Sequence, residues 1–145
     1  MALENSEDII EYLKTLGADK IPHSKTNLLD HCMNVADMLR DHGRPVEEQL
    51  AGLFHSIYGN EFQTYKINVS REDVRNVIGE RSEYLVNLFC TLNDRVNTIL
   101  HGTDLEEADR TSLRWIEYCN IKEQDPTSDI LDAFEILTIR TGNRI

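Results

Sequence analysis

The sequence predicts an all-α fold, a compact bundle of about six or seven helices in a single domain spanning residues 1–145. Apolar residues recur at steps of three and four along most of the chain, which is the period of an amphipathic helix. No segment keeps the strict alternation of a half-buried strand, and no hairpin dipeptide is present. A chain of 145 residues is also long enough to bury about 70% of its unfolded surface in one core.

Glycine, proline and capping residues divide this pattern into elements. Ser6 can cap a first helix and Gly17 can stop it, and Pro45 suits the first turn of the third helix. Ser70 to Asp73 and Thr103 to Glu106 have the form of capping boxes. The stretches 21–24 and 60–69 are expected to be loops. The expected helices span residues 6–17, 26–43, 45–59, 70–79, a long segment ending near 102, then 103–125 and 127–142.

Charge and composition exclude several classes of partner. The formal net charge is −11 and the basic residues form no cluster, so nucleic acid and anionic membranes would be repelled. No apolar run approaches the roughly 20 residues that span a bilayer. The acidic start also lacks the basic and apolar regions of a signal peptide, which predicts a cytoplasmic protein. Three scattered cysteines fit small core residues in a reducing compartment.

Two histidines are the main candidates for chemistry. His31 falls in line with Leu28 and Val35 on the inward face of its helix, and His55 follows 24 residues later in the next expected helix. The short connection between these helices predicts that they pack side by side, so both imidazoles can converge on one point. Neutral imidazole is the commonest metal ligand, and with oxygen donors it suits Fe, Mn or Zn.

The structural alternative is a core histidine bonded to a backbone carbonyl, which is common for either residue taken alone. Two inert imidazoles are less favourable, because a buried polar group without a partner costs about 1–3 kcal/mol.

The segments H-C-M-N-V-A-D-M-L-R-D-H-G, from His31, and A-G-L-F-H-S-I-Y-G-N-E-F, from Ala51, resemble the first two motifs of the HD-domain phosphohydrolase superfamily. The resemblance is closest to the branch that hydrolyses guanosine tetra- and pentaphosphate alarmones. An uncharacterised HD-like family is nearer still, with H-S-x-x-x-L-L-x-H, A-G-L-F-H-S-I-Y-G and a late A-N-x-x-E-Q motif. Here the corresponding residues are His23-Ser24, Leu28 to His31, Ala51 to Gly59, Tyr118 to Asn120 and Glu123-Gln124.

This resemblance covers roughly residues 20–125 and implies an HD-like helical bundle with a central pocket. The chain departs from the HD pattern at two ligand positions, because Ser56 and Asn120 stand where relatives carry aspartates. The acidic pair that follows in relatives becomes Gly59-Asn60, with Glu61 directly after. With these two aspartates replaced, a changed shell of His23, His31, His55 and Glu117 or Glu61 can hold a divalent metal, and loss of the metal is the alternative. Glu61 and Tyr58 are the candidate catalytic residues, and Tyr58 fits an aromatic core or rim residue equally well. His23, Ser56, Asn120 and Gln124 are the candidate ligand contacts.

Three hypotheses follow. The first is a metal-dependent hydrolase acting on a phosphorylated or other small polar substrate, or an iron-dependent HD-type enzyme that activates oxygen. The second is a non-catalytic domain that binds a small molecule or regulates, having lost the HD metal site. The third is a structural protein whose acidic surface meets a partner. Similarity of fold cannot choose among them.

Overall fold

The chain folds as a bundle of α-helices, as its periodicity predicts. A computed structural model describes residues 6–23, 25–59 and 65–138. Within these ranges there are eight α-helices, one 3₁₀ turn and one small hairpin of two two-residue strands. The helices are α1 Ser6–Thr15, α2 Leu28–Asp41, α3 Val46–Leu53, α4 Arg71–Ile78, α5 Glu80–Thr91, α6 Arg95–His101, α7 Glu107–Gln124 and α8 Ile130–Leu137, with η1 at Ala18–Lys20, β1 at Pro22–His23 and β2 at Thr26–Asn27.

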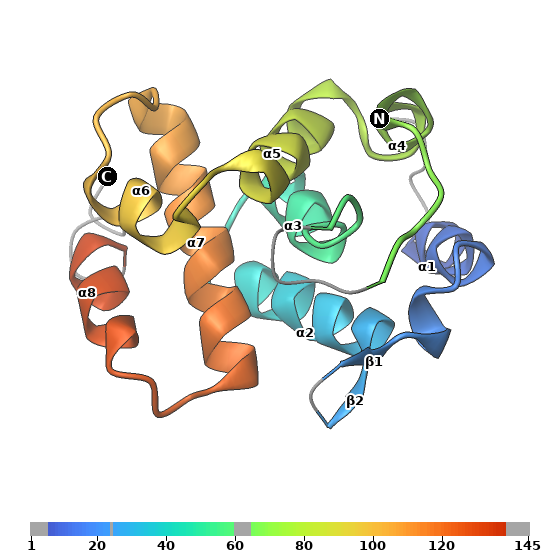
Figure 1. Cartoon of the computed structure of the whole chain (residues 1–145), viewed down its shortest axis with the longest axis horizontal. Coiled ribbons are helices and arrows are strands. Elements are labelled where there is room, and N and C mark those ends of the chain that lie inside the picture. Colours follow the sequence, from blue (N-terminus) through green and yellow to red (C-terminus); the bar gives the residue numbers. More distant parts are fainter. Residues whose placement is uncertain (1–5, 24, 60–64, 139–145) are drawn as a thin grey trace.

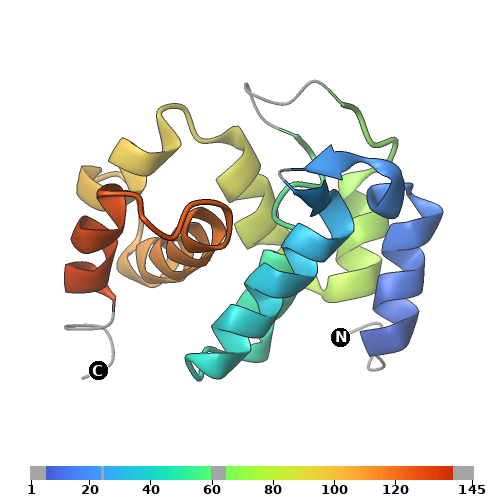
Figure 2. The same ribbon diagram turned by 90° about the horizontal axis from the view of Figure 1, so that it is seen from below.

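The arrangement places α2, α3 and α5 in the middle of the molecule (Figure 1). On one side lie α6, α7 and α8, and on the other lie α1 and α4, a division that the orthogonal view also shows (Figure 2). The most extensive helix pair is α2 with α3, followed by α2 with α7. The start of α2, the end of α3 and the end of α7 therefore share one interior region.

Several predicted boundaries are confirmed. Asn27 caps α2 by accepting a hydrogen bond from the backbone N–H of Asp30 at 2.8 Å, and Ser70 caps α4 through Asp73. Gly17, Gly43 and Gly79 all have positive φ angles, which glycine adopts without steric cost. These turns end α1, α2 and α4 near the expected residues.

Four predictions about elements are wrong. The long helix expected to end near residue 102 is two helices, α5 and α6, because the chain turns at Leu92 to Asp94, where Asp94 is left-handed (φ 48°). This split gives eight helices where about six or seven were expected. The third helix ends at Leu53 and not near Gly59, so Phe54 to Tyr58 form turns. The capping box expected at Thr103 to Glu106 is absent, because α7 begins at Glu107 and has no side-chain hydrogen bond at its cap. The loop expected at 21–24 contributes β1 to the hairpin.

Gly52 allows α2 and α3 to pack closely. A Cβ at this position would lie 2.5 Å from Cδ1 of Leu39 and 3.3 Å from Cγ1 of Val35, both of which are fully buried. Because a close-packed core offers those methyl groups no free space, the helix pair requires glycine here.

Gly52→Ala should therefore lower the free energy of unfolding by about 1–3 kcal/mol, measured by urea denaturation, although alanine is the better helix former. In a Leu39→Ala background the same substitution should cost less, because its methyl group then has room. Equal costs in the two backgrounds would contradict the proposed close contact.

Candidate functional site

His31 and His55 meet in the interior, as the sequence predicts. His31 lies in the first turns of α2 and is 1% exposed, and His55 lies in the turn after α3 and is 2% exposed. Their Nε2 atoms are 3.3 Å apart. Oδ1 of Asn120, from the last turns of α7, lies 2.8 Å from Nε2 of His31 and 3.1 Å from Nε2 of His55. Three polar atoms from three helical segments thus converge.

The ring of His55 is held by the end of its own helix. Its Nδ1 lies 2.7 Å from the backbone carbonyl of Gly52, which can only accept, so Nδ1 carries the proton and donates it. Burial, followed by the charge of His31, lowers the pKa of His55 to about 3. The ring is therefore neutral at neutral pH, and its Nε2 presents a lone pair to the interior.

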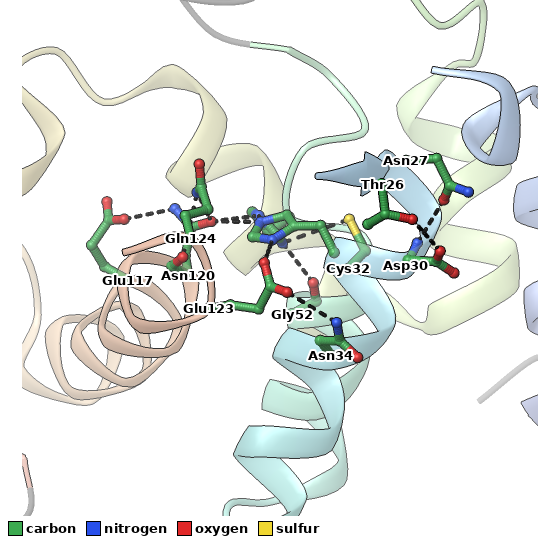
Figure 3. A network of polar contacts seen from close by, with 12 residues as sticks. Thr26, Asn27, Asp30, Cys32, Asn34, Gly52, Glu117, Asn120, Glu123 and Gln124 are labelled. Carbon is green, nitrogen blue, oxygen red and sulfur yellow. Dashed lines mark hydrogen bonds and ion pairs between the residues drawn. The ribbon is translucent and has the colours of Figure 1, made fainter. Parts of the chain in front are cut away.

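The ring of His31 is held by Glu123 of α7. Nδ1 of His31 lies 2.5 Å from Oε1 of Glu123, whose other oxygen accepts from Asn34 at 2.9 Å. Burial acts to raise the pKa of Glu123, but the hydrogen bonds from His31 and Asn34 outweigh it, and the pKa is lowered. The ionised carboxylate, labelled in Figure 3 beside Asn34, holds a proton of His31 on Nδ1, and Nε2 of His31 faces His55 and Asn120.

The amide of Asn120, whose Oδ1 is the third converging atom, is held by two other side chains of α7. Nδ2 of Asn120 donates to Oε1 of Glu117 at 2.9 Å, and Nε2 of Gln124 donates to Oδ1 of Asn120 at 2.9 Å. The carbonyl end of this amide therefore faces the imidazoles. With both rings neutral, the centre of the cluster contains three acceptor atoms and none of the three carries a hydrogen toward the others. Such a group requires either a proton on one ring or a cation.

His23 stands beside this cluster on β1. Its ring centroid is 4.2 Å from that of His31, and its Nε2 is buried without a hydrogen-bond partner among the residues that the structure describes. Burial, followed by the charge of His31, lowers the pKa of His23. An unpartnered imidazole nitrogen next to the paired histidines can accept a hydrogen bond from a ligand or coordinate an ion.

The four-residue metal set expected from the sequence, His23, His31, His55 and Glu117, is not assembled. Within the ranges that the structure describes, no group of three or more His, Cys, Asp or Glu side chains is placed to hold a metal ion. Glu117 is engaged by Asn120 and by an ion pair with Arg95, so it reaches the imidazoles only through Asn120. The third atom that meets the two imidazoles is the amide oxygen of Asn120.

The other predicted residues lie around the cluster. Gln124 contacts Asn120, as described above, and Ser56 is buried beside His55, with its backbone carbonyl accepting from Tyr65. The hydroxyl of Tyr58 donates to Glu83 at 2.8 Å, and burial, followed by that hydrogen bond, raises its pKa strongly. Tyr58 is therefore protonated at neutral pH and turned toward Glu83. Glu61 lies outside the described residues.

Two residues of the site were not assigned roles from the sequence. Glu123 belongs to the late motif and shares the helix face of Asn120, three residues away, so its spacing was an available signal. Arg95 falls within the segment that the sequence predicts as one continuous helix. It instead begins α6, stacks over the ring of Phe89 at 4.2 Å and pairs with Glu117, 22 residues away, which no local pattern indicates.

Comparisons with known proteins give a family and no function. Residues 12–95 match a family described as Domain of unknown function (DUF6817). This region includes His23, His31 and His55 and stops before α7. No curated protein matches, and no solved structure matches. None of the described helices is long and apolar enough to cross a membrane.

Acidification should destabilise the metal-free protein through His55. The unfolded chain takes up a proton near the ordinary pKa of 6.5, whereas folded His55 does so only near pH 3. Its contribution to stability is thus intact above about pH 6.5 and falls by up to about 1.4 kcal/mol for each pH unit below it. Urea denaturation in EDTA between pH 7 and 4.5 should show a shallower pH dependence for His55→Gln than for the wild type. Parallel curves would contradict this assignment.

Proposed function

The chain belongs to the DUF6817 family, and we propose that it is a divergent HD-like domain that binds a divalent metal and hydrolyses a phosphorylated or other small polar substrate. His31, His55 and Asn120 would hold the metal, which would be Fe, Mn or Zn. The three thiols of Cys32, Cys90 and Cys119 are free, which supports a reducing compartment such as the cytoplasm.

One observation carries the proposal. Two imidazole nitrogens and an amide oxygen face one another, and Nδ1 of each imidazole already has an acceptor on the opposite side of its ring. A proton on one ring satisfies only one or two of these contacts. A cation at the centre would satisfy all three atoms together, because each offers it a lone pair.

The spacing of the three atoms supports this interpretation. Ligands at roughly 2.1 Å from one ion lie about 3.0–3.4 Å apart in octahedral or tetrahedral geometry. Two of the separations here, 3.3 and 3.1 Å, lie within this range, and the third, 2.8 Å between Nε2 of His31 and Oδ1 of Asn120, is shorter. The hydrogen bond from His31 to Glu123 is also the outer contact that metal-binding histidines usually make.

Three protein donors leave coordination positions for water and substrate, as in catalytic metal sites. A divalent metal bound there would supply Lewis acidity and lower the pKa of a coordinated water. The residues of the chain do the rest. Glu123 and Gly52 orient the imidazoles, and the unpartnered Nε2 of His23 is available to bind a polar group of the substrate or to take up a proton. The hydrolytic reaction class comes from the resemblance to HD enzymes.

Protein purified without a metal-affinity tag should contain close to one Fe, Mn or Zn ion per chain, measured by mass spectrometry of the metal content. The double variant His31→Ala, His55→Ala should lose this metal, because it removes two of three ligands. His101→Ala is the matched control, since His101 is an exposed histidine of α6, and it should retain the metal.

Circular dichroism and a thermal melt should establish that each variant is folded. Asn120→Leu, which removes one donor at similar volume, provides a milder test and should weaken metal binding without abolishing it. Folded wild-type protein that takes up no more metal than the double variant, even after incubation with each ion, would overturn the proposal.

A second candidate function is a metal-free domain that binds a small molecule. The observation in its favour is that none of the three converging atoms carries a negative charge. A second proton on His31, at Nε2, would donate a hydrogen bond to Oδ1 of Asn120 and would satisfy these atoms without a metal. For this function, a thermal-shift screen with nucleotides should show stabilisation of the EDTA-treated protein that depends on Asn120 and Tyr58. Stabilisation that appears only with added metal would favour the metal-dependent hydrolase.

A further inference from the structure

Glu117 is a buried carboxylate that serves two donors at once. It is 1% exposed, and its Oε2 accepts from Nε of Arg95 while its Oε1 accepts from Nδ2 of Asn120. Arg95 comes from α6 and is held in place by stacking over Phe89. The two oxygens of Glu117 are therefore each committed, one to Arg95 of a neighbouring helix and one to the amide in the site. Figure 3 shows the second of these contacts, between Glu117 and Asn120.

The amide of Asn120 has a donor end and an acceptor end, and its neighbours decide which end faces the histidines. An ionised carboxylate only accepts, so the NH₂ end must face Glu117. Gln124 imposes the same orientation from the other side. Its Nε2 lies 3.3 Å from the backbone carbonyl of Asn120 and 2.9 Å from Oδ1, and both of these oxygens accept.

From this geometry we infer that Glu117, anchored by Arg95, is a positioning residue that turns the carbonyl oxygen of Asn120 toward the paired imidazoles. In the opposite orientation the NH₂ group would lie within hydrogen-bond distance of Nε2 of both His31 and His55, at 2.8 and 3.1 Å, and would donate to their lone pairs. A cation would then be excluded. Glu117 thus acts on the site through the amide of Asn120 and is not a ligand itself, and Arg95 balances its charge.

The substitution Glu117→Gln removes this control with almost no change of shape. Glutamine has one acceptor and one NH₂ group. If the oxygen of the new glutamine accepts from Arg95, the NH₂ group of that glutamine faces Asn120. The amide of Asn120 must then rotate so that its oxygen accepts from this NH₂ group. If its oxygen faces Asn120, two donors meet at Arg95, which is unfavourable in a buried position. We expect the first arrangement, with the Asn120 NH₂ group facing the histidines, because the exposed side chain of Gln124 can turn its own amide whereas Arg95 cannot become an acceptor.

Exchanging the carboxylate of Glu117 and the amide of Asn120 should restore an oxygen that faces the histidines. In Glu117→Gln, Asn120→Asp, the glutamine accepts from Arg95 and donates to one oxygen of the new carboxylate, whose second oxygen faces the imidazoles. Asn120→Asp alone places two carboxylates at 2.9 Å, the separation of the present hydrogen bond, and should be unfavourable. The double variant should therefore behave better than either single variant, a coupling that independent structural roles would not produce.

The first measurement uses metal-free protein and does not depend on the proposed function. Long-range ¹H–¹⁵N spectra of the histidines report whether Nε2 of His55, an atom that Glu117 does not touch, accepts a hydrogen bond. In Glu117→Gln this signal should move to the hydrogen-bonded position, with the proton still on Nδ1. The double variant should return it toward the wild-type position. An unchanged signal in folded Glu117→Gln would overturn the inference.

The second measurement rests on the proposed metal site and uses Zn²⁺ or Mn²⁺ alone as the probe, titrated by calorimetry. Glu117→Gln should lose roughly 10–100-fold in affinity, the usual effect of removing an outer contact, and the double variant should recover it or exceed the wild type. The control is Glu48→Gln, which alters another buried glutamate, paired with Arg44 and Ser112, and should leave affinity unchanged.

The two proposals fail in distinguishable ways. Wild-type protein that binds no metal while the His55 signal responds to Glu117→Gln contradicts the proposed function and supports the positioning role. Metal binding that is equal in the wild type and in Glu117→Gln, with an unchanged His55 signal, contradicts the positioning role and leaves the metal site standing. A loss of affinity that Glu48→Gln reproduces indicates general destabilisation and also overturns the positioning role.

Discussion

The site depends on where the two imidazole protons are held. His55 donates its Nδ1 proton to the carbonyl of Gly52, and His31 donates its Nδ1 proton to Glu123, so both remaining nitrogens point inward. Neither partner can donate in return, which makes this tautomer the only one that satisfies the neutral rings. The approach of Asn120 with its carbonyl end and the need for a central cation or proton both follow from this constraint, whereas burial keeps His55 neutral at neutral pH.

The fold brings these partners together through close packing and buried ion pairs. Gly52 contributes twice, since its missing side chain admits Leu39 and its carbonyl orients His55. Three glutamates are buried in the described core, and an arginine pairs with each of them, which offsets the cost of removing the carboxylates from water. One of these pairs, Glu117 with Arg95, directly adjoins the site and holds the amide of Asn120.

Much of this arrangement could be predicted from the sequence, and the rest depends on contacts between distant segments. The helical period placed His31 on the inward face of α2, and the short connection placed α3 beside it. The end of α3 could not be located, because Phe54 to Tyr58 keep an apolar pattern while forming turns. The pairing of Glu117 with Arg95 was also inaccessible, since it depends on how α6 crosses α7. The interpretation of Glu117 as a metal ligand was made without this pairing, which engages its carboxylate with Arg95 and Asn120.

The central claim is that one metal ion sits between the three converging atoms. A crystal structure of metal-loaded protein, with anomalous diffraction recorded on both sides of the absorption edge of the metal, tests it most directly. The account predicts one anomalous peak within coordinating distance of Nε2 of His31, Nε2 of His55 and Oδ1 of Asn120. An interior without such a peak, in crystals of protein saturated with metal, would contradict the account and leave a shared proton as the link between the rings.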